Sequence, residues 1–135
     1  MTLVTPHKIL IIRSETSELK KLRSFLSEVF EENKLPDKCF NKVLLCVSEA
    51  VVNSIQHGNR YNKEKQVCIK VEINKSTLHV TIIDEGQGFD SDKISDPTLP
   101  ENITKESGRG IHIIKSCCDQ VEFDKNKSLI RFKLD

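Results

Sequence analysis

The sequence predicts a two-layer α/β sandwich, in which helices cover one face of a mostly antiparallel sheet. Three observations favour this fold class. Two amphipathic helical patterns follow a first short strand pattern, the later strand patterns alternate apolar and polar residues, and short polar turns join neighbouring strands. Alternation indicates strands with one buried and one solvated face, so we expect the helices on one side of the sheet.

The first half of the chain predicts one strand and two helices. Residues 7–13 form a short run rich in isoleucine, which is typical of a strand with apolar side chains on both faces. Apolar residues then recur at three- and four-residue steps, which predicts an amphipathic helix over residues 19–33 with Ser14 as its N-cap. A second helix is expected from Pro36 to Gly58, where glycine suits a left-handed cap.

The second half predicts four strands and one more helix. The expected strands lie at residues 67–73, 78–82, 120–124 and 128–134. The helix lies between the second and third of them, at residues 110–118. Residues 90–108 show no periodicity and contain two prolines, and we interpret this stretch as a flexible lid over a ligand. Counting in twos from Leu78 places Asp84 on the buried face of its strand, where a carboxylate without a partner would be costly.

Length and charge limit the classes of protein that fit. A chain of 135 residues is expected to form a single domain, residues 1–135, and its five cysteines, lacking a framework spacing, read as reduced thiols. With 21 basic and 20 acidic residues the net charge of +1 favours neither nucleic acid nor an anionic membrane as a partner. No apolar stretch has the length of a membrane span or a signal peptide, so we expect a cytoplasmic protein.

Polar residues and glycines mark a candidate site. Glu49 and Asn53 lie four residues apart on the second predicted helix and therefore share a face. The chain has only five glycines, fewer than the usual share of about 7%, and four of them form the pairs Gly86/Gly88 and Gly108/Gly110. Glycine is needed where a ligand approaches the backbone closely, so two such pairs around one helix face indicate one ligand.

A nucleotide explains these residues best. The buried Asp84 can accept a hydrogen bond from an adenine amino group, and Asn53 can give one oxygen ligand to Mg²⁺, which otherwise keeps waters and phosphate oxygens. Glu49, one turn before Asn53, is placed to take a proton from a hydroxyl that attacks the γ-phosphate. The Gly108 pair at the start of a helix offers backbone amides to phosphate. The chain contains neither a Walker motif nor a Rossmann fingerprint.

Three segments resemble the sequence boxes of the Bergerat-fold (GHKL) ATPases and, among them, the anti-sigma factor serine-protein kinases of bacteria. Residues 48–58 (SEAVVNSIQHG) are similar to the N box, residues 84–90 (DEGQGFD) to the first glycine box and residues 108–111 (GRGI) to the second. Ser54 stands where alanine is commoner in the family. The resemblance covers nearly the whole chain and implies the histidine-kinase-like ATPase fold, ATP and Mg²⁺.

The same resemblance implies roles for individual residues. Glu49 would be the catalytic base and Asn53 the magnesium ligand, and Asp84 would bind adenine. The remaining nucleotide-binding candidates are Gly86, Gly88, Gly108, Arg109 and Gly110. Two partners are implied: a sigma factor, and a STAS-type anti-sigma factor antagonist whose serine or threonine is phosphorylated.

Other readings of these residues stay open. The same boxes permit a non-catalytic switch that binds ATP and a partner without phosphoryl transfer. A sensor histidine kinase is a weaker alternative, because the chain shows no dimerisation hairpin carrying a phospho-acceptor histidine. Taken alone, Glu49 and Asn53 could form a solvated patch, and His57 could simply pack near the end of its helix. Arg109 could contact phosphate, a partner or only solvent, and we assign it no catalytic role.

The first strand predicts a homodimer. Ile9 and Ile11 point to one face of residues 7–13, and Leu10 and Ile12 point to the other. Helices on one side of the sheet can cover only one of these faces, so we expect a second copy of the chain to cover the other. Family members similar to this chain are also dimeric. Charges placed at Leu10 and Ile12 are the test that the sequence suggests.

Overall fold

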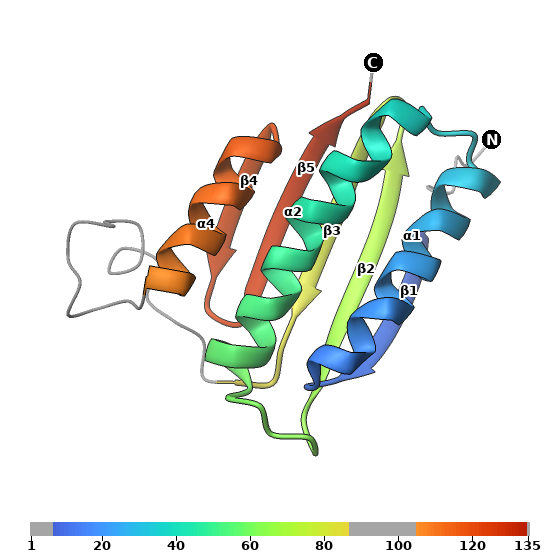
Figure 1. Ribbon diagram of the computed structural model, residues 1–135. Helices are drawn as coiled ribbons and strands as arrows, with labels where there is room; N and C mark the ends of the chain where they lie inside the picture. The colour runs from blue at the N-terminus through green and yellow to red at the C-terminus, as the bar shows by residue number, and fades with distance from the viewer. Residues whose placement is uncertain (1–6, 87–104, 135) are drawn as a thin grey trace.

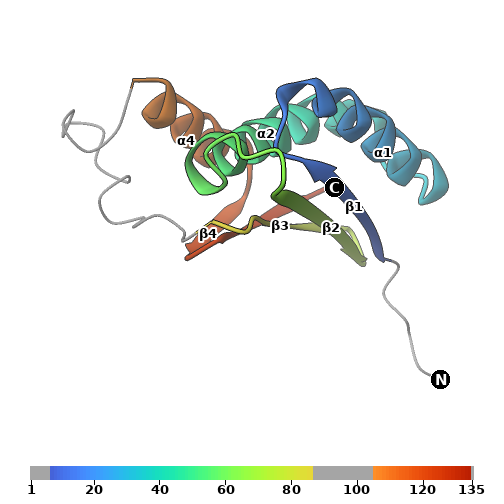
Figure 2. The same cartoon turned by 90° about the horizontal axis from the view of Figure 1, so that it is seen from below.

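The computed structural model describes residues 7–86 and 105–134 and shows two layers. Seen along its edge, the sheet forms one layer, and helices α1, α2 and α4 lie together on one of its sides (Figure 2). The predicted two-layer α/β sandwich with helices on one face is therefore confirmed.

The sheet has five strands in the order β1-β2-β3-β5-β4, and all four pairings are antiparallel. Figure 1 shows the strands side by side behind the helices. Their bounds are β1 His7–Arg13, β2 Gln66–Asn74, β3 Thr77–Ile83, β4 Gln120–Asp124 and β5 Lys127–Lys133. The residues paired across the central strands, such as Val71 with Val80 and Val80 with Ile130, are buried, so the register brings apolar side chains onto the same face.

In the described part of the chain, the helical layer is built from three α-helices and three shorter turns. The α-helices are α1 Leu19–Glu32, α2 Phe40–Asn53 and α4 Lys105–Cys117. The turns are the 3₁₀ turns η1 Thr16–Glu18 and η2 Asp37–Cys39, and the π-turn η3 Ser54–Gly58, which extends α2 without a break. Helix α2 lies between α1 and α4 in Figure 1 and has the most central position in this layer.

The core fills the space between the two layers. Its fully buried side chains come from both: Leu22, Leu26, Val43, Val47 and Ile55 from the helices, and Ile12, Ile69, Leu78, Ile82, Ile130 and Phe132 from the strands. Strand β3 alternates strictly between buried and half-buried residues. This alternation continues past the end of β3, so that Asp84 is buried on the core side as predicted.

Two predicted helix caps are wrong. Ser14 is buried, but Glu15 stands at the N-cap position of η1, and the Ser14 hydroxyl donates instead to the Lys65 carbonyl oxygen at 2.8 Å. Gly58 lies within η3 and has no left-handed backbone; the left-handed residues follow it, at Arg60 (φ 51°) and Tyr61 (φ 59°). Glycine is needed at position 58 because the residue lies in close contact with the Asp84 carboxylate.

Helix α4 begins earlier than predicted, at Lys105 rather than at Gly110. Residues 105–108, which the sequence assigned to the lid, therefore form the first turn of this helix. Gly108 and Gly110 hid the helical pattern of this segment, because glycine is unfavourable inside a helix. The rest of the predicted lid, residues 90–104, lies outside the described residues.

The two faces of β1 differ in burial. Ile12 is 2% exposed and Leu10 packs against the core, whereas Ile9 and Ile11 are 53% and 54% exposed on the opposite side of the sheet. The suggested test with charges at Leu10 and Ile12 is therefore wrong, since those side chains face the helices of their own chain. The uncovered apolar pair is Ile9 and Ile11.

Within the residues that the structure describes, no helix is long and apolar enough to cross a membrane.

Candidate nucleotide-binding site

The end of α2 forms one wall of the candidate site. Glu49 and Asn53 lie one turn apart, with Glu49 half-buried and Asn53 6% exposed. The helix then widens into η3, whose closing bond runs from the Asn59 N–H to the Ser54 carbonyl oxygen at 2.8 Å, five residues back. Wide turns of this kind are rare and occur frequently at functional sites.

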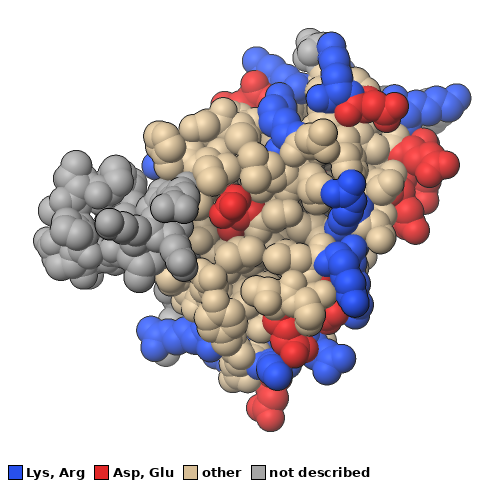
Figure 3. Space-filling model, in the orientation of Figure 1, with Lys and Arg blue, Asp and Glu red and all other residues tan. Residues whose placement is uncertain are grey.

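Gly110 of α4 faces this acid–amide pair. A Cβ atom added to Gly110 would lie 3.1 Å from Glu49 Oε2, 3.5 Å from Asn53 Oδ1 and 3.7 Å from Asn53 Nδ2. Both polar side chains therefore reach the same point on α4, although 57 residues separate Asn53 from Gly110 in the sequence. A solvated patch, one of the readings left open, does not account for the burial of Asn53 at this contact. Figure 3 shows the surrounding helical face as mainly uncharged over α2 and α4, with one acidic group inside that area.

Asn53 has an unsatisfied hydrogen-bonding group. Its Nδ2 atom is buried and has no hydrogen-bond partner among the residues that the structure describes. An unpaired buried amide is destabilising by about 1–3 kcal/mol, so such groups call for a ligand or water. The nitrogen and oxygen of an asparagine amide occupy nearly equivalent positions, so the same side chain can turn its oxygen to a cation.

Asp84 forms the second part of the site, just beyond the end of β3. Its carboxylate is buried at 3% exposure and accepts a hydrogen bond from the Gly86 N–H at 2.8 Å. Burial raises the pKa of Asp84 above its ordinary value, while the Gly86 amide, the Ser54 hydroxyl and the charge of Lys65 act in the opposite direction. These partners leave acceptor capacity on the carboxylate, since two oxygens can accept about four hydrogen bonds.

Two glycines allow η3 and the segment after β3 to touch. A Cβ atom at Gly58 would lie 2.2 Å from Asp84 Oδ2, and one at Gly86 would lie 1.9 Å from the carbonyl oxygen of Gly58. Neither position has room for a side chain. Glycine at both positions therefore brings the carboxylate of Asp84 against the end of the helix that carries Glu49 and Asn53.

The other predicted residues are only partly described. Gly108 and Arg109 belong to the first two turns of α4, but the Arg109 side chain lies outside what the structure describes, and so does Gly88. His57 is half-buried in η3, and burial lowers the pKa of its imidazole, which favours the neutral ring.

Sequence reasoning missed Asn59. This residue is 1% exposed and makes hydrogen bonds to three separate segments around Asp84. It stands in an aperiodic polar stretch, where neither spacing nor hydropathy distinguishes a buried asparagine from an ordinary turn residue. The only available signal was its position directly after the helix that ends at Gly58.

The donor set fits a magnesium ion shared with phosphates. Within residues 7–86 and 105–134, no group of three or more His, Cys, Asp or Glu side chains is arranged to hold a metal. Mg²⁺ does not need such a cage, because it is usually bound through one or two protein oxygens together with water and phosphate oxygens. The unpaired, buried Asn53 amide supplies one ligand of this kind.

The antiparallel sheet, the helical layer on one of its faces and the polar cluster at one end define a two-layer α/β sandwich with a candidate nucleotide site. The comparison with protein families agrees. Residues 12–134 match the family described as "Histidine kinase-like ATPase domain", and the chain belongs to this family.

Individual relatives are consistent with this membership. The chain is 36% identical over 89 residues to an "Anti-sigma F factor" of Clostridium beijerinckii, a match that covers 64% of the chain and 62% of that protein. It is 41% identical over 86 residues to an "Anti-sigma F factor" of Bacillus cytotoxicus, covering 61% of the chain and 58% of that protein. The matches thus span about three fifths of these relatives.

A solved structure supports the fold. A crystal structure of the RsbU and RsbW domains of a Mycobacterium tuberculosis protein aligns with 95% of the chain and 32% of its own length, with a TM-score of 0.59 and 14% identity. At this identity the likeness concerns the fold alone.

Proposed function

We propose that this chain is an anti-sigma factor that binds ATP and Mg²⁺ and phosphorylates a serine or threonine of a STAS-type antagonist protein. In this proposal the chain also sequesters a sigma factor. Because it binds both a sigma factor and the antagonist protein, we propose that it acts in the cytoplasm. The observation that carries the catalytic part is the meeting of Glu49, Asn53 and Gly110 across two helices. The similarity to proteins named anti-sigma F factor supports the choice of partners.

Glu49 acts in this proposal as the general base. Its half-buried carboxylate stands at the rim between α2 and α4 and can accept the proton of a substrate hydroxyl as that oxygen attacks the γ-phosphate. Asn53 holds Mg²⁺, which when bound supplies positive charge that neutralises the phosphate oxygens. Because Gly110 has no side chain, it leaves room beside the side chains of Glu49 and Asn53.

Asp84 and the glycines bind the nucleotide at the other end of the site. The buried carboxylate accepts a hydrogen bond from the amino group of adenine, and Gly86 keeps the adjoining backbone close to η3. Gly88, Gly108, Arg109 and Gly110 remain proposed nucleotide contacts. Because α4 begins at Lys105, the amide of Gly110 lies past the free N–H groups of the first turn, so its proposed role is close approach and not an amide offered to phosphate.

Phosphoryl transfer is tested by incubating the purified chain with Mg²⁺, ATP and candidate antagonist proteins and then weighing the antagonists by mass spectrometry. We expect one antagonist to gain a phosphoryl group. Glu49→Gln should keep ATP affinity, because the amide has the same shape, but slow the transfer by about 10²–10⁴-fold through loss of the base. Glu122→Gln, on an exposed residue of β4, is the matched control.

The outcomes separate the two functions that the site permits. ATP binding without transfer to any antagonist would favour the non-catalytic partner switch over the kinase. Transfer at the wild-type rate by Glu49→Gln would reduce Glu49 to a residue that shapes the end of α2. Asn53→Ala should lose the part of ATP affinity that depends on Mg²⁺, measured by titration with and without the metal.

We also propose that the chain is a homodimer, which joins through the outer face of β1. Ile9 and Ile11 are more than half exposed there, on a strand at the edge of the sheet. A second copy is the partner that the symmetry of oligomers favours for such a patch.

A further inference from the structure

Asn59 links three segments that meet beside Asp84. Its side-chain Nδ2 donates to Ser14 Oγ at 2.7 Å and to the Gln66 carbonyl oxygen at 2.9 Å. Its Oδ1 accepts from the Glu85 N–H at 2.8 Å. The end of β1, the start of β2 and the segment after β3 are therefore joined through one buried side chain.

The orientation of this amide is determined by its partners. A carbonyl oxygen can only accept and a backbone N–H can only donate, so Nδ2 must face Gln66 and Oδ1 must face Glu85. The flipped amide would place oxygen against oxygen and N–H against N–H. Both polar atoms of its side chain are thus used within the protein, in contrast to Asn53, whose Nδ2 has no partner in the described part of the chain.

The backbone at Asp84 is held on the opposite side by a second asparagine. The Asp84 N–H donates to the Asn126 carbonyl oxygen at 3.0 Å, and Asn126 Nδ2 donates to the Asp84 carbonyl oxygen. Strand β3 ends at Ile83, so the regular ladder no longer fixes the chain here. Asn126 on one side and Asn59 on the other take the place of the ladder.

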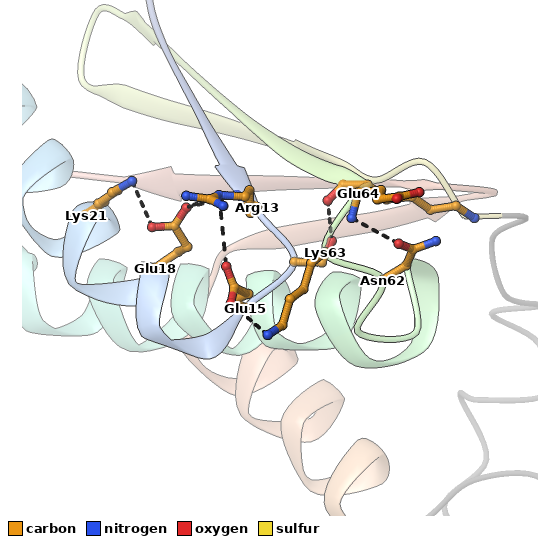
Figure 4. A network of polar contacts seen from close by, with 9 residues as sticks. Arg13, Glu15, Glu18, Lys21, Asn62, Lys63 and Glu64 are labelled. Carbon is orange, nitrogen blue, oxygen red and sulfur yellow. Dashed lines mark hydrogen bonds and ion pairs between the residues drawn. The ribbon is translucent and has the colours of Figure 1, made fainter.

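The neighbouring contacts do not hold the Glu85 amide. The Gln66 N–H donates to the carboxylate of Glu85, and the ion pairs of Glu15 join only side chains. Figure 4 shows Glu15 between Arg13 and Lys63, at 4.0 Å from Arg13 and 3.4 Å from Lys63. Arg13 and Lys63 are well exposed, and exposed pairs contribute little because water and salt screen them. The loop also passes through left-handed backbone at Arg60 and Tyr61, a conformation that persists only where surrounding contacts enforce it.

We propose that Asn59 is a positioning residue for base selection: by holding the Glu85 amide, it fixes the direction in which Asp84 presents its carboxylate to the amino group of adenine. This inference rests on the proposed ATP binding. Selection of adenine over a base that carries a carbonyl in place of the amino group then depends on Asn59, a side chain that does not contact the nucleotide.

The test compares ATP with inosine triphosphate, in which a carbonyl replaces the adenine amino group. Wild-type protein should bind ATP about tenfold to a hundredfold more tightly than inosine triphosphate. This is the difference in affinity expected for one hydrogen bond to a charged group. In Asn59→Ala this ratio of dissociation constants should fall by about threefold or more. Asn62→Ala is the matched control, since Asn62 lies in the same loop and is exposed. Its side-chain Oδ1 accepts a hydrogen bond from the nearby Glu64 N–H (Figure 4).

The ratio distinguishes positioning from stability. A variant that is merely less stable lowers the folded fraction equally for both nucleotides, which leaves their ratio unchanged. An unchanged ratio in Asn59→Ala would therefore overturn the inference while the proposed ATP binding stands. A wild-type chain that binds neither nucleotide, or both equally, would overturn the inference together with the adenine contact.

A second measurement needs no variant. Exchange of the Glu85 amide hydrogen with solvent, followed by NMR in the wild-type protein, should be slowed at least about tenfold relative to an unstructured peptide, because its acceptor is buried. Exchange at the unprotected rate would show that Asn59 does not hold this amide, and would overturn the inference even if Asn59→Ala does not fold.

Discussion

Asp84 combines an unfavourable environment with a functional position. Its carboxylate is buried, and its resolved partners are one backbone amide and one hydroxyl together with the more distant charge of Lys65. An ionised group in such a place is less stable than in water unless more hydrogen bonds reach it. The amino group of a bound adenine would supply one, so ligand binding and relief of this unfavourable burial would occur together.

Asp84→Asn should therefore weaken ATP binding at neutral pH. Replacing the charged acceptor by an amide should reduce the binding free energy by about 1.5–3 kcal/mol, the usual contribution of a hydrogen bond to a charged group. Calorimetric titration measures this, with Asp124→Asn on exposed β4 as control. Equal affinity of Asp84→Asn and wild type would remove Asp84 from the adenine contact.

The same variant should change how stability depends on pH. The pKa of Asp84 is raised in the folded chain above the usual 3.8. At a pH between 3.8 and the folded-state pKa, the Asp84 carboxyl therefore binds its proton more tightly in the folded state than in the unfolded state. This contribution is fully present below pH 3.8 and is lost as the pH rises through the folded-state pKa. The unfolding free energy of wild type minus that of Asp84→Asn should thus be larger near pH 4 than at pH 7.

Urea unfolding of both proteins at the two pH values gives this difference directly. The comparison cancels the other titrating groups, including His57, whose lowered pKa acts in the opposite direction. A difference that stays constant, or grows with pH, would mean that burial does not dominate the titration of Asp84.

At the scale of elements, sequence patterns predicted location better than boundaries. Strands β1 and β4 have the predicted bounds, because apolar alternation ends there at polar turns. The inward direction of Asp84 also followed from counting in twos along β3. In contrast, two features were not predicted. The early start of α4 was hidden by Gly108 and Gly110, and the π-turn η3 lies in close contact with Asp84 and Gly86, which are distant in the sequence.

The glycines illustrate the same distinction. Their clustering correctly drew attention to close backbone approach, but the partner in that approach could not be identified from the sequence. At Gly58 and Gly86 the near neighbours are groups of the protein itself, namely the Asp84 carboxylate and the Gly58 carbonyl oxygen. Their roles toward a nucleotide stay predictions.

Gly86→Ala should destabilise the fold much more than Gly110→Ala. The new Cβ at position 86 would lie 1.9 Å from a backbone oxygen, which cannot move without shifting η3, so we expect a loss of about 3 kcal/mol, at the upper end for overpacking. At position 110 the nearest atom is the end of the Glu49 side chain, 3.1 Å away, which can turn aside. Alanine there also favours the helix by about 1 kcal/mol.

Urea unfolding measures both changes, and the kinase assay gives a second readout. Gly110→Ala should keep its stability but transfer phosphate more slowly, because Glu49 is displaced. Similar stability of the two variants would contradict the tight contact between η3 and the segment that follows β3.

At the scale of the whole molecule, the sheet has one covered and one open face. The described helices α1, α2 and α4 lie on the covered side (Figure 2). The other side carries Ile9, Ile11 and Leu129 as its exposed large apolar residues among those described. The sequence predicted an uncovered apolar face on β1 from its unbroken run of apolar residues. The choice of Leu10 and Ile12 as the exposed pair was wrong, since the exposed pair depends on the side to which the helices fold.

The corrected dimer test places charges on the exposed pair. Ile9→Lys with Ile11→Lys should yield a monomer of unchanged circular dichroism, because lysines buried between two copies would lose their hydration without a partner. Light scattering at micromolar concentration reports the mass. Leu45→Lys is the matched control, since Leu45 is 47% exposed on the helical side of the molecule. A wild-type monomer would end the dimer proposal, and a dimer that survives both charges would move the interface away from β1.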